Sequence, residues 1–165
     1  MSTVDLILSR RSIRRYENKD IPEEVLQQIL ETGRQAPSAV NRQPIRFVIV
    51  NDHDVLKNLC NNLIARFVKH APLAIVGCAN TKSLLTGKWA VVDTTIAMQN
   101  MVIAAWTLGI GSCWIGSCSE KKVKELLQIP NKWKVVALVT LGYPAEQPKP
   151  KKKKSFEDLF SFNKF

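Results

Sequence analysis

A cluster of arginines near the start of the chain is the feature most able to do chemistry. The segment reads Arg10, Arg11, Ser12, Ile13, Arg14, Arg15 and Tyr16. Permanently charged guanidinium groups packed this closely around a hydroxyl are typical of an anion site. A solvated helix end would have the same composition, because a short stretch with apolar residues at helical spacing comes directly before the cluster.

A second segment, bounded by two prolines, combines small residues with side-chain amides. It reads Pro37, Ser38, Ala39, Val40, Asn41, Arg42, Gln43 and Pro44. The amides of Asn41 and Gln43 can each donate and accept hydrogen bonds, and the small residues let other groups approach the backbone. By itself this composition also suits an ordinary polar loop.

Nucleophilic catalysis finds little support in the sequence. His53 lies in a polar turn, and His70 stands at the end of a helix before Ala71 and Pro72. Neither histidine has the neighbours that a catalytic base needs. We therefore expect no catalytic side chain.

The four cysteines stand at positions 60, 78, 113 and 118. They lack the paired spacing of a structural zinc site, so we expect no bound metal. Cys78 falls within an apolar strand and is predicted to be a small core residue. Cys113 and Cys118 flank a possible active-site turn, and a redox role for one of them stays open. The preferred interpretation of the set is reduced thiols in a cytoplasmic protein.

Two common nucleotide-binding motifs are missing from the sequence. Gly109, Ile110 and Gly111 follow a helix instead of a strand and lack the third glycine of a dinucleotide fingerprint. Gly87 and Lys88 have no glycine five positions earlier, as a Walker loop requires. A chain rich in anion-binding groups and poor in catalytic side chains fits an enzyme whose cofactor carries the chemistry.

The elements that must position these groups follow from hydrophobic periodicity. We expect helices over about 22–36, 54–69, 89–108 and 119–128, and strands over about 46–50, 72–79, 112–115 and 135–141. The strands are continuously apolar, which indicates that helices cover both faces of a sheet. The long third helix is expected to be buried all round. The predicted class is therefore α+β in layers, with a single domain over residues 1–165.

The chain is strongly basic, with a formal net charge of +10, and five of its lysines lie between positions 149 and 154. A basic tail over residues 149–165 could attract nucleic acid or a membrane, act as a solvated linker, or clamp a phosphate. Asp5 and Arg10 bracket the first apolar residues, so no signal peptide is expected. Polar residues interrupt the most apolar window, over 91–108, so no membrane span is expected.

Five segments, in order along nearly the whole chain, resemble the nitroreductase family of FMN-dependent oxidoreductases. They are residues 10–14, residues 36–44, the helix 93–108 with the following 109–112, residues 114–116, and residues 141–144. The resemblance implies a layered α/β/α fold with a mixed, mainly antiparallel central sheet and a long buried central helix. It also implies an intertwined homodimer with FMN at the subunit interface.

The resemblance assigns roles within the arginine cluster. Arg10 would meet the FMN phosphate, Arg11 and Ser12 the phosphate or ribityl chain, and Arg14 the N1 and O2 edge of the isoalloxazine. Two-electron reduction places negative charge at that edge, and a fixed cation there would stabilise it. Arg15 has no matching role and is expected to be a surface residue.

The remaining matched residues would complete the cofactor site. Those that would reach the flavin from the partner subunit are Pro37, Ser38, Ala39, Asn41 and Gln43. Ile115 and Gly116 match a turn near N5, where hydride arrives. Lys151 and Lys153 match a basic pair that closes on the phosphate, with the tail folding back on the FMN site or on the partner subunit.

The implied reaction is ping-pong transfer of hydride from NADH or NADPH through flavin N5 to a small planar acceptor such as a nitroaromatic, a quinone or a flavin. The loop over 80–88 and Trp89 would wall the substrate side, because the helical insertion of larger members is missing. Two alternatives stay open. One is a non-catalytic FMN carrier or sensor. The other is a basic nucleic-acid-binding module, which the lack of aromatic residues among the basic clusters disfavours.

Overall fold

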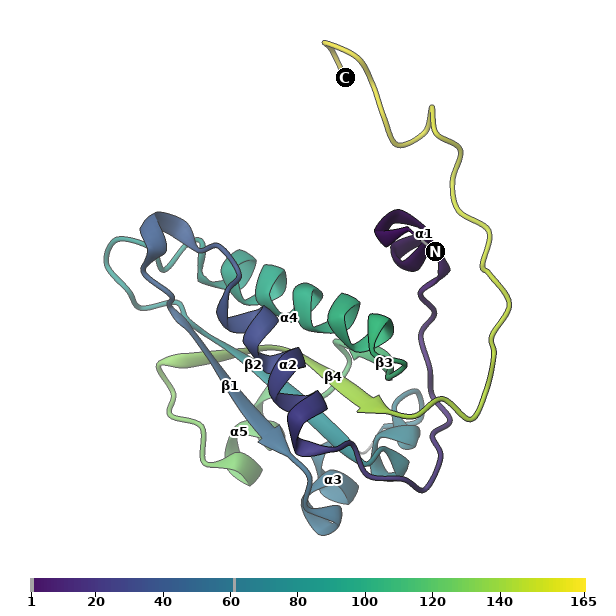
Figure 1. The fold of residues 1–165 in the computed structure, drawn as a ribbon. Coiled ribbons are helices and arrows are strands. Elements are labelled where there is room, and N and C mark those ends of the chain that lie inside the picture. The colour runs from purple at the N-terminus through teal and green to yellow at the C-terminus, as the bar shows by residue number, and fades with distance from the viewer. Residues whose placement is uncertain (1, 61) are drawn as a thin grey trace.

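The computed structural model describes residues 2–60 and 62–165. One sheet of four antiparallel strands, in the order β1-β2-β4-β3, has helices on both faces (Figure 1). The strands are β1 (Ile45–Val50), β2 (Leu73–Asn80), β3 (Gly111–Ile115) and β4 (Trp133–Gly142). The helices are α1 (Thr3–Ser9), α2 (Glu23–Arg34), α3 (His53–Leu59), α4 (Ala90–Thr107) and α5 (Glu120–Leu127), with 3-10 turns η1 (Ala39–Asn41) and η2 (Arg66–His70). The layered α+β class expected from the sequence is confirmed.

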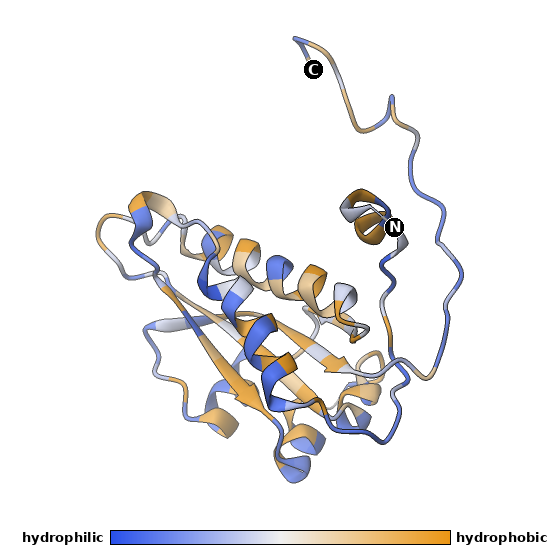
Figure 2. Ribbon diagram, viewed as in Figure 1, coloured by the Kyte–Doolittle hydropathy of each residue, from blue (hydrophilic) through white to orange (hydrophobic). Residues whose placement is uncertain are grey.

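The central strand β2 separates two hydrophobic cores. Leu73 and Ile75 belong to the core that β2 shares with α2 and α4, whereas Ala74 and Val76 belong to the core under α3, η2 and α5. Side chains alternate between the faces of a strand, so a strand covered on both faces must be apolar at successive positions. The strands are accordingly the most uniformly hydrophobic part of the chain (Figure 2).

Helix α4 lies against both α2 and the sheet at very short range. A Cβ atom at Gly33 would overlap the side chain of Met101, and one at Gly77 would overlap Met98. The flexible thioethers fill the spaces that the two glycines leave. The expectation that this helix is buried all round holds for only part of its surface in the single chain, since Val92 is 45% exposed.

The prediction of one helix over 54–69 is wrong for the second half of this range. α3 ends at Leu59, Cys60 takes an extended conformation, and η2 forms a separate turn. The spacing of Leu63 and Ile64 suggested a continuous apolar face, but these side chains are 81% and 79% exposed. They have no core to cover at this point of the chain.

The cysteines also differ from expectation. Cys60 forms a disulfide with Cys118, which lies 58 residues later, with a Cα–Cα distance of 5.2 Å. The interpretation of these two as reduced thiols is therefore wrong. Cys78 and Cys113 are free and buried, which confirms the core position predicted for Cys78.

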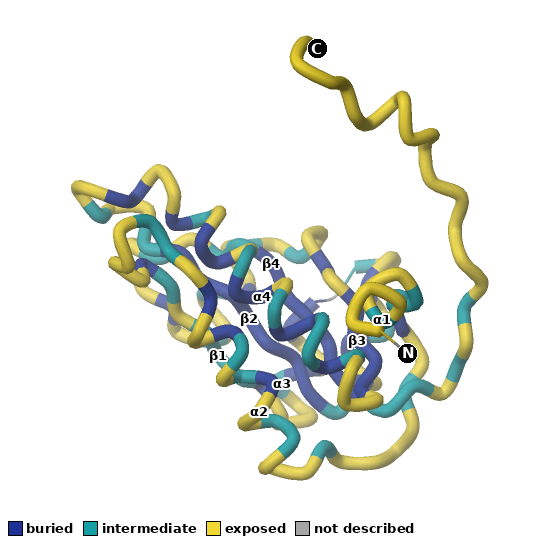
Figure 3. Tube along the Cα trace, turned by 45° about the horizontal axis from the view of Figure 1, so that its top comes forward, coloured by how far each residue is buried: buried dark blue, intermediate teal, exposed yellow. Residues whose placement is uncertain are grey.

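The two ends of the chain lie outside the layers. Helix α1 is attached to α4 by a hydrogen bond of 2.9 Å from the indole N–H of Trp106 to the Ser9 hydroxyl. Residues 151–165 are exposed throughout, and the tail leads away from the sheet (Figures 1 and 3). Within the described residues, no helix combines the length and hydrophobicity needed to cross a membrane.

Candidate functional site

The arginine segment runs alongside strand β3. Ser12 and Ser112 form an isolated parallel bridge, and the Ile13 N–H donates to the Ser112 carbonyl at 2.8 Å. Ile13 is 1% exposed, and its side chain occupies the space in which a Cβ of Gly111 would lie. One buried isoleucine and one strand pairing thus fix the backbone on which the charged residues are carried.

The other side of this segment is held by residues that follow β4. The Glu17 N–H donates to the Tyr143 carbonyl and the Ala145 N–H to the Arg15 carbonyl, each at 2.9 Å. The Glu146 carboxylate accepts hydrogen bonds from the backbone N–H groups of Arg14 and Arg15. The segment is therefore clamped between β3 and the chain after β4.

Tyr16 anchors the segment to the sheet below it. Its hydroxyl donates to the Ile13 carbonyl at 2.6 Å and lies 2.7 Å from the Thr140 hydroxyl. Burial raises the pKa of the Tyr16 phenol well above its usual range, so the group stays neutral and can donate at physiological pH.

The guanidinium groups themselves have no acidic partner in the described part of the chain, where the ion pairs lie only on α2 and α5. Arg11 donates to the carbonyls of Leu8 and Arg10 at 2.9 and 3.0 Å. The Arg14 guanidinium carbon lies 5.9 Å from the centre of the Phe67 ring, within reach of a cation–π interaction. This part of the surface can hold an anion without first breaking an internal ion pair.

The turn after β3 leaves open space beside the arginine segment. Ile115 is buried, whereas Gly116 is exposed, and a Cβ built on it would have no atom of the described residues within 4 Å apart from its chain neighbours. Trp114, 38% exposed, lies on the same strand. The arrangement offers backbone groups and an unobstructed surface to a flat ligand.

The second predicted segment has a strained backbone. Val40, Asn41 and Gln43 adopt φ values of 45°, 54° and 51°, a conformation that is costly above all for a β-branched residue. The Gln43 N–H donates to the Ser38 hydroxyl at 3.0 Å, and the Gln43 side-chain amide donates to Asn41. Pro37, Asn41 and Gln43 are exposed, and Ser38 and Ala39 are half-buried.

Asp93, in the first turn of α4, fixes this strained segment. Its Oδ1 atom accepts a hydrogen bond of 3.2 Å from the Ala39 N–H, although the residue is only 4% exposed. The second oxygen, Oδ2, is buried and has no hydrogen-bond partner among the described residues. A buried carboxylate is costly, so its presence at this junction indicates a positional requirement.

The two parts of the predicted site are not brought together within one chain. Ala39 contacts Asp93 at the beginning of α4, whereas the bridge between Ser12 and Ser112 lies beyond the end of this helix. The 18 residues of α4 span about 27 Å at 1.5 Å per residue. The loop over 80–88 lies at the first of these ends, since the Asn80 N–H donates to the Pro44 carbonyl.

The lysines of the tail also stand apart from the arginines. A cavity of about 410 Å³ is lined by Arg11, Glu146 and Pro150, so the tail starts beside the arginine segment. Lys151 and Lys153 come directly after this point and are exposed. The structure does not bring either of them into contact with the arginines.

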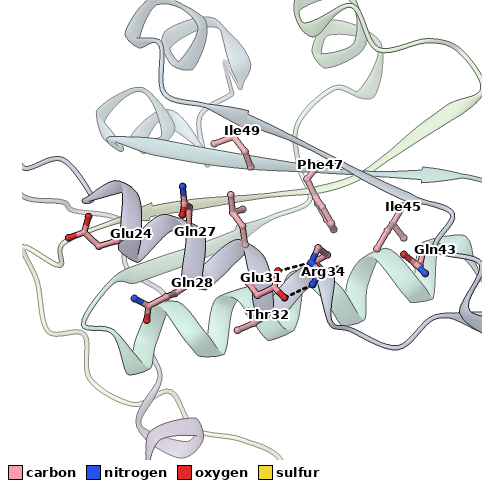
Figure 4. Close-up of a pocket in the computed structure, with 11 residues that line it drawn as sticks. Glu24, Gln27, Gln28, Glu31, Thr32, Arg34, Gln43, Ile45, Phe47 and Ile49 are labelled. Carbon is pink, nitrogen blue, oxygen red and sulfur yellow. Dashed lines mark hydrogen bonds and ion pairs between the residues drawn. The ribbon is translucent and has the colours of Figure 1, made fainter.

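A groove of about 1220 Å³ lies elsewhere, between α2 and β1 (Figure 4). Its floor is formed by Ile45, Phe47 and Ile49, and Gln43 is the only predicted site residue that lines it. The expectation that β1 is covered on both faces holds only in part: Val48 and Val50 pack against one core and Phe47 and Ile49 against the other, but only Val50 of this edge strand is buried. α2 covers the strand incompletely and leaves the groove.

Sequence reasoning did not single out Asp93, Glu146 or the pair of Cys60 and Cys118. A lone acid near the start of an apolar helix was a usable signal for Asp93. Nothing local distinguishes Glu146, because its role depends on a contact more than a hundred residues away in sequence.

The comparisons with known proteins agree on one family. A family model described as the nitroreductase family matches residues 7–83 and 61–143. A Methanothermobacter thermautotrophicus protein named "Putative NADH dehydrogenase/NAD(P)H nitroreductase" is 34% identical over 154 residues, which cover 90% of this chain and 80% of that protein. The structure of an FMN-dependent nitroreductase from Clostridium difficile R20291 superposes with a TM-score of 0.84 at 31% identity, covering 98% of this chain and 99% of the other. The NADPH:FMN oxidoreductase of Vibrio harveyi, solved in complex with NAD+, superposes with a TM-score of 0.89 at 28% identity, covering 99% of this chain and 77% of the other.

Proposed function

The chain belongs to the nitroreductase family and is an NAD(P)H-dependent flavin oxidoreductase, and we propose that it binds FMN between the arginine segment of one subunit and residues 37–43 of a second copy. The observation that carries this proposal is the combination of unpaired guanidinium groups with open space at Gly116, in the part of the chain that the structure describes. A cofactor with a phosphate at one end and a flat ring at the other fits these residues.

When bound, FMN supplies transfer of hydride from NADH or NADPH to a small planar acceptor, in a ping-pong order. Nitroaromatics, quinones and flavins are the acceptor classes that we propose. An exposed turn at Gly116 supports this choice, because a surface without side chains tolerates many flat molecules. We propose that Trp89, at the start of α4, and the loop over 80–88 line the acceptor site of the other subunit.

The arginine segment is proposed to bind the cofactor by charge. Arg10 binds the phosphate, and Arg11 and Ser12 bind the phosphate or the ribityl chain. Arg14 lies at the edge of the ring and stabilises the negative charge that arrives with two electrons. Its contact with Phe67 supports this role, since it holds the guanidinium in place without neutralising its charge.

The separation of the two parts of the proposed site along α4 supports a homodimer. Pro37, Ser38, Ala39, Asn41 and Gln43 are proposed to reach the flavin of the other subunit, with Ile115 and Gly116 lying near N5. The exposed tail supports the same assembly, because Phe156 and Phe160 pack on each other with ring centroids 4.4 Å apart, yet the phenylalanines of the tail all remain exposed. Lys151 and Lys153 are then proposed to close on a phosphate at the interface. A cytoplasmic location remains part of the proposal.

The absorption spectrum of the purified protein tests this function. The protein should be yellow, and NADH or NADPH should bleach it under anaerobic conditions. Protein that is colourless and takes up no added FMN overturns the proposal. A yellow protein that neither nucleotide bleaches would indicate a carrier or sensor, and an affinity for nucleic acid without flavin would indicate a binding module.

Substitution of Arg10 tests the phosphate position. Arg10→Ala should weaken FMN binding by about tenfold or more, because loss of a charge-assisted contact costs about 1.5–3 kcal/mol. The matched control is Arg15→Ala, which removes the same charge from a residue to which we assign no role. Equal flavin retention by both variants would place the phosphate elsewhere.

A further inference from the structure

The disulfide between Cys60 and Cys118 joins the turn after β3 to the end of α3. Cys118 stands two residues after Gly116, the residue proposed to face the flavin. Cys60 directly follows the last residue of α3. The disulfide is therefore part of the structure that supports the turn on which the proposed flavin site depends.

The two sulfur atoms lie in different environments. Cys60 is 6% exposed, whereas Cys118 is only half-buried on the surface of the same core. A reagent from solvent can therefore approach Cys118 more easily than Cys60. Redox pairs commonly consist of one accessible and one protected cysteine, and a purely structural cross-link has no need of this difference.

Asn62 places a hydrogen-bond donor against one of the sulfurs. Its Oδ1 atom accepts from the N–H groups of Ile64 and Ala65 at 3.0 and 2.8 Å, so the amide group faces the other way. Nδ2 then donates to Cys60 Sγ at 3.5 Å and to the Ser117 carbonyl at 2.8 Å. A disulfide sulfur is a weak acceptor, but a thiolate is a strong one, so this donor favours the reduced pair.

Helix α5 adds a second source of positive potential. Ser119, the residue after Cys118, is its N-cap, and the Ser119 hydroxyl accepts a hydrogen bond from the Lys122 N–H. A cysteine at the beginning of a helix has its thiolate stabilised by the aligned peptide dipoles. Cys118 combines this position with partial exposure and with a partner already within bonding distance.

The two free cysteines have none of these features. Burial raises the pKa of Cys78 to about 11 and raises the pKa of Cys113 as well. Both are buried in strands and are expected to stay protonated and unreactive. They serve as internal controls for the disulfide pair.

We propose that Cys60 and Cys118 form a redox-active disulfide that accepts two electrons from the flavin of the adjacent turn, a further activity that rests on the proposed function. The S–S bond breaks, the two sulfur atoms take up two electrons and two protons, and two thiols form. One NADH or NADPH, oxidised at the flavin, supplies the electron pair and one proton, and solvent supplies the second proton. Reduction also releases residues 116–118 from their covalent link to α3.

Thiol labelling of the FMN-loaded protein tests the transfer. Anaerobic addition of NADPH or NADH, followed by iodoacetamide under native conditions and peptide mass spectrometry, should label Cys118 first and then Cys60. Protein without FMN should show no labelling of the pair with either nucleotide, but should show it after dithiothreitol. A bleached flavin with an intact disulfide, in protein whose pair dithiothreitol does open, overturns the proposal.

An anaerobic reductive titration with dithionite provides a second readout. The wild-type chain with bound FMN should take up four electrons per subunit, two at the flavin and two at the disulfide. The double variant Cys60→Ser with Cys118→Ser should take up two per subunit. The control Cys113→Ala, which removes the free thiol nearest to the arginines, should still take up four. A wild-type uptake of two electrons overturns the inference.

The outcomes separate this inference from the function on which it rests. If FMN binds but neither nucleotide bleaches it, the proposed reductase activity fails, and light-driven reduction of the bound flavin still decides whether the disulfide opens. If the flavin is bleached and the disulfide stays closed, only the inference fails. A protein that binds no FMN overturns both.

Discussion

The Glu146 carboxylate accepts a hydrogen bond from the backbone N–H of Arg14, a residue 132 positions earlier in the chain. The same oxygen accepts a second bond, of 3.1 Å, from the N–H of Arg15. The carboxylate thus fixes the Arg14 backbone while leaving the guanidinium free for a ligand. An acidic residue here positions a cation without forming an ion pair with it.

Replacement of Glu146 should disturb the arginine segment. Glu146→Ala leaves two N–H groups without their acceptor, so the free energy of unfolding should fall by about 1–3 kcal/mol and FMN should bind more weakly. Glu146→Gln keeps an acceptor oxygen, so its free energy of unfolding and its FMN affinity should lie between those of the wild type and of Glu146→Ala. Urea unfolding and flavin titration measure these effects, and identical behaviour of the alanine and glutamine variants would argue against the backbone role.

Arg14→Ala should lower the reduction potential of the bound flavin. Loss of a charge-assisted contact worth about 1.5–3 kcal/mol in the reduced state corresponds to about 30–60 mV for a two-electron couple. The potential can be measured by equilibration with a reference dye. Arg15→Ala is the matched control and should leave the potential unchanged, and an unchanged potential in both variants would reject the position given to Arg14.

Asp93→Ala should release the strained segment at Val40. The Ala39 N–H loses its acceptor in this variant. Without that hydrogen bond, the strained backbone with positive φ values should relax to a different conformation. We expect a loss of about 1–3 kcal/mol in stability together with weaker FMN binding. Asp93→Asn retains an acceptor and should preserve more of both. If the wild type and Asp93→Ala bind FMN with equal affinity, residues 37–43 do not contact the flavin.

Gly116→Val should block the flavin without unfolding the chain. The space around a Cβ at Gly116 is open, so the melting temperature should stay close to that of the wild type while FMN retention is lost. Gly109→Val is an informative contrast. Gly109 has a φ of 76°, which valine tolerates poorly, so that variant should lose stability instead. Full FMN binding by Gly116→Val would remove this turn from the site.

Tyr16 should make stability depend on alkaline pH. Its pKa is raised in the folded chain by burial, so the stabilisation is fully present below the ordinary value near 10 and is lost as the pH rises above it. Tyr16→Phe should be less stable at pH 7 by about 1 kcal/mol, since bonds to Ile13 and Thr140 are lost. The difference between the two proteins should shrink above pH 10 in chemical unfolding experiments. A constant difference would show that the phenol does not titrate on unfolding.

The layered fold could be predicted because its signals are local. The continuous apolar runs that became β2 and β4, and the proline and acidic residues at the start of α2, each report on their own surroundings. The break after Leu59 could not be predicted in this way. Leu63 and Ile64 continue the helical spacing, but Cys60 forms a disulfide with Cys118, a residue 58 positions away.

The candidate site was predictable only in part, for a related reason. The arginines, the residues around Asn41 and the turn at Gly116 could be predicted as site residues because their own types carry the resemblance, and these assignments stay predictions. The hydrogen bonds from Ala39 to Asp93 and from Arg14 to Glu146 join residues distant in sequence, so no pattern along the chain announces them. The separation of the site into two parts likewise depends on the length of α4.

A chain made from its N-terminus exposes Ser12 and Tyr16 long before the residues that pair with them exist. Ser12 pairs with Ser112, and Tyr16 pairs with Pro144 after the last strand. The arginine segment therefore stays unanchored during most of synthesis, and its backbone is fixed only when nearly the whole chain has left the ribosome.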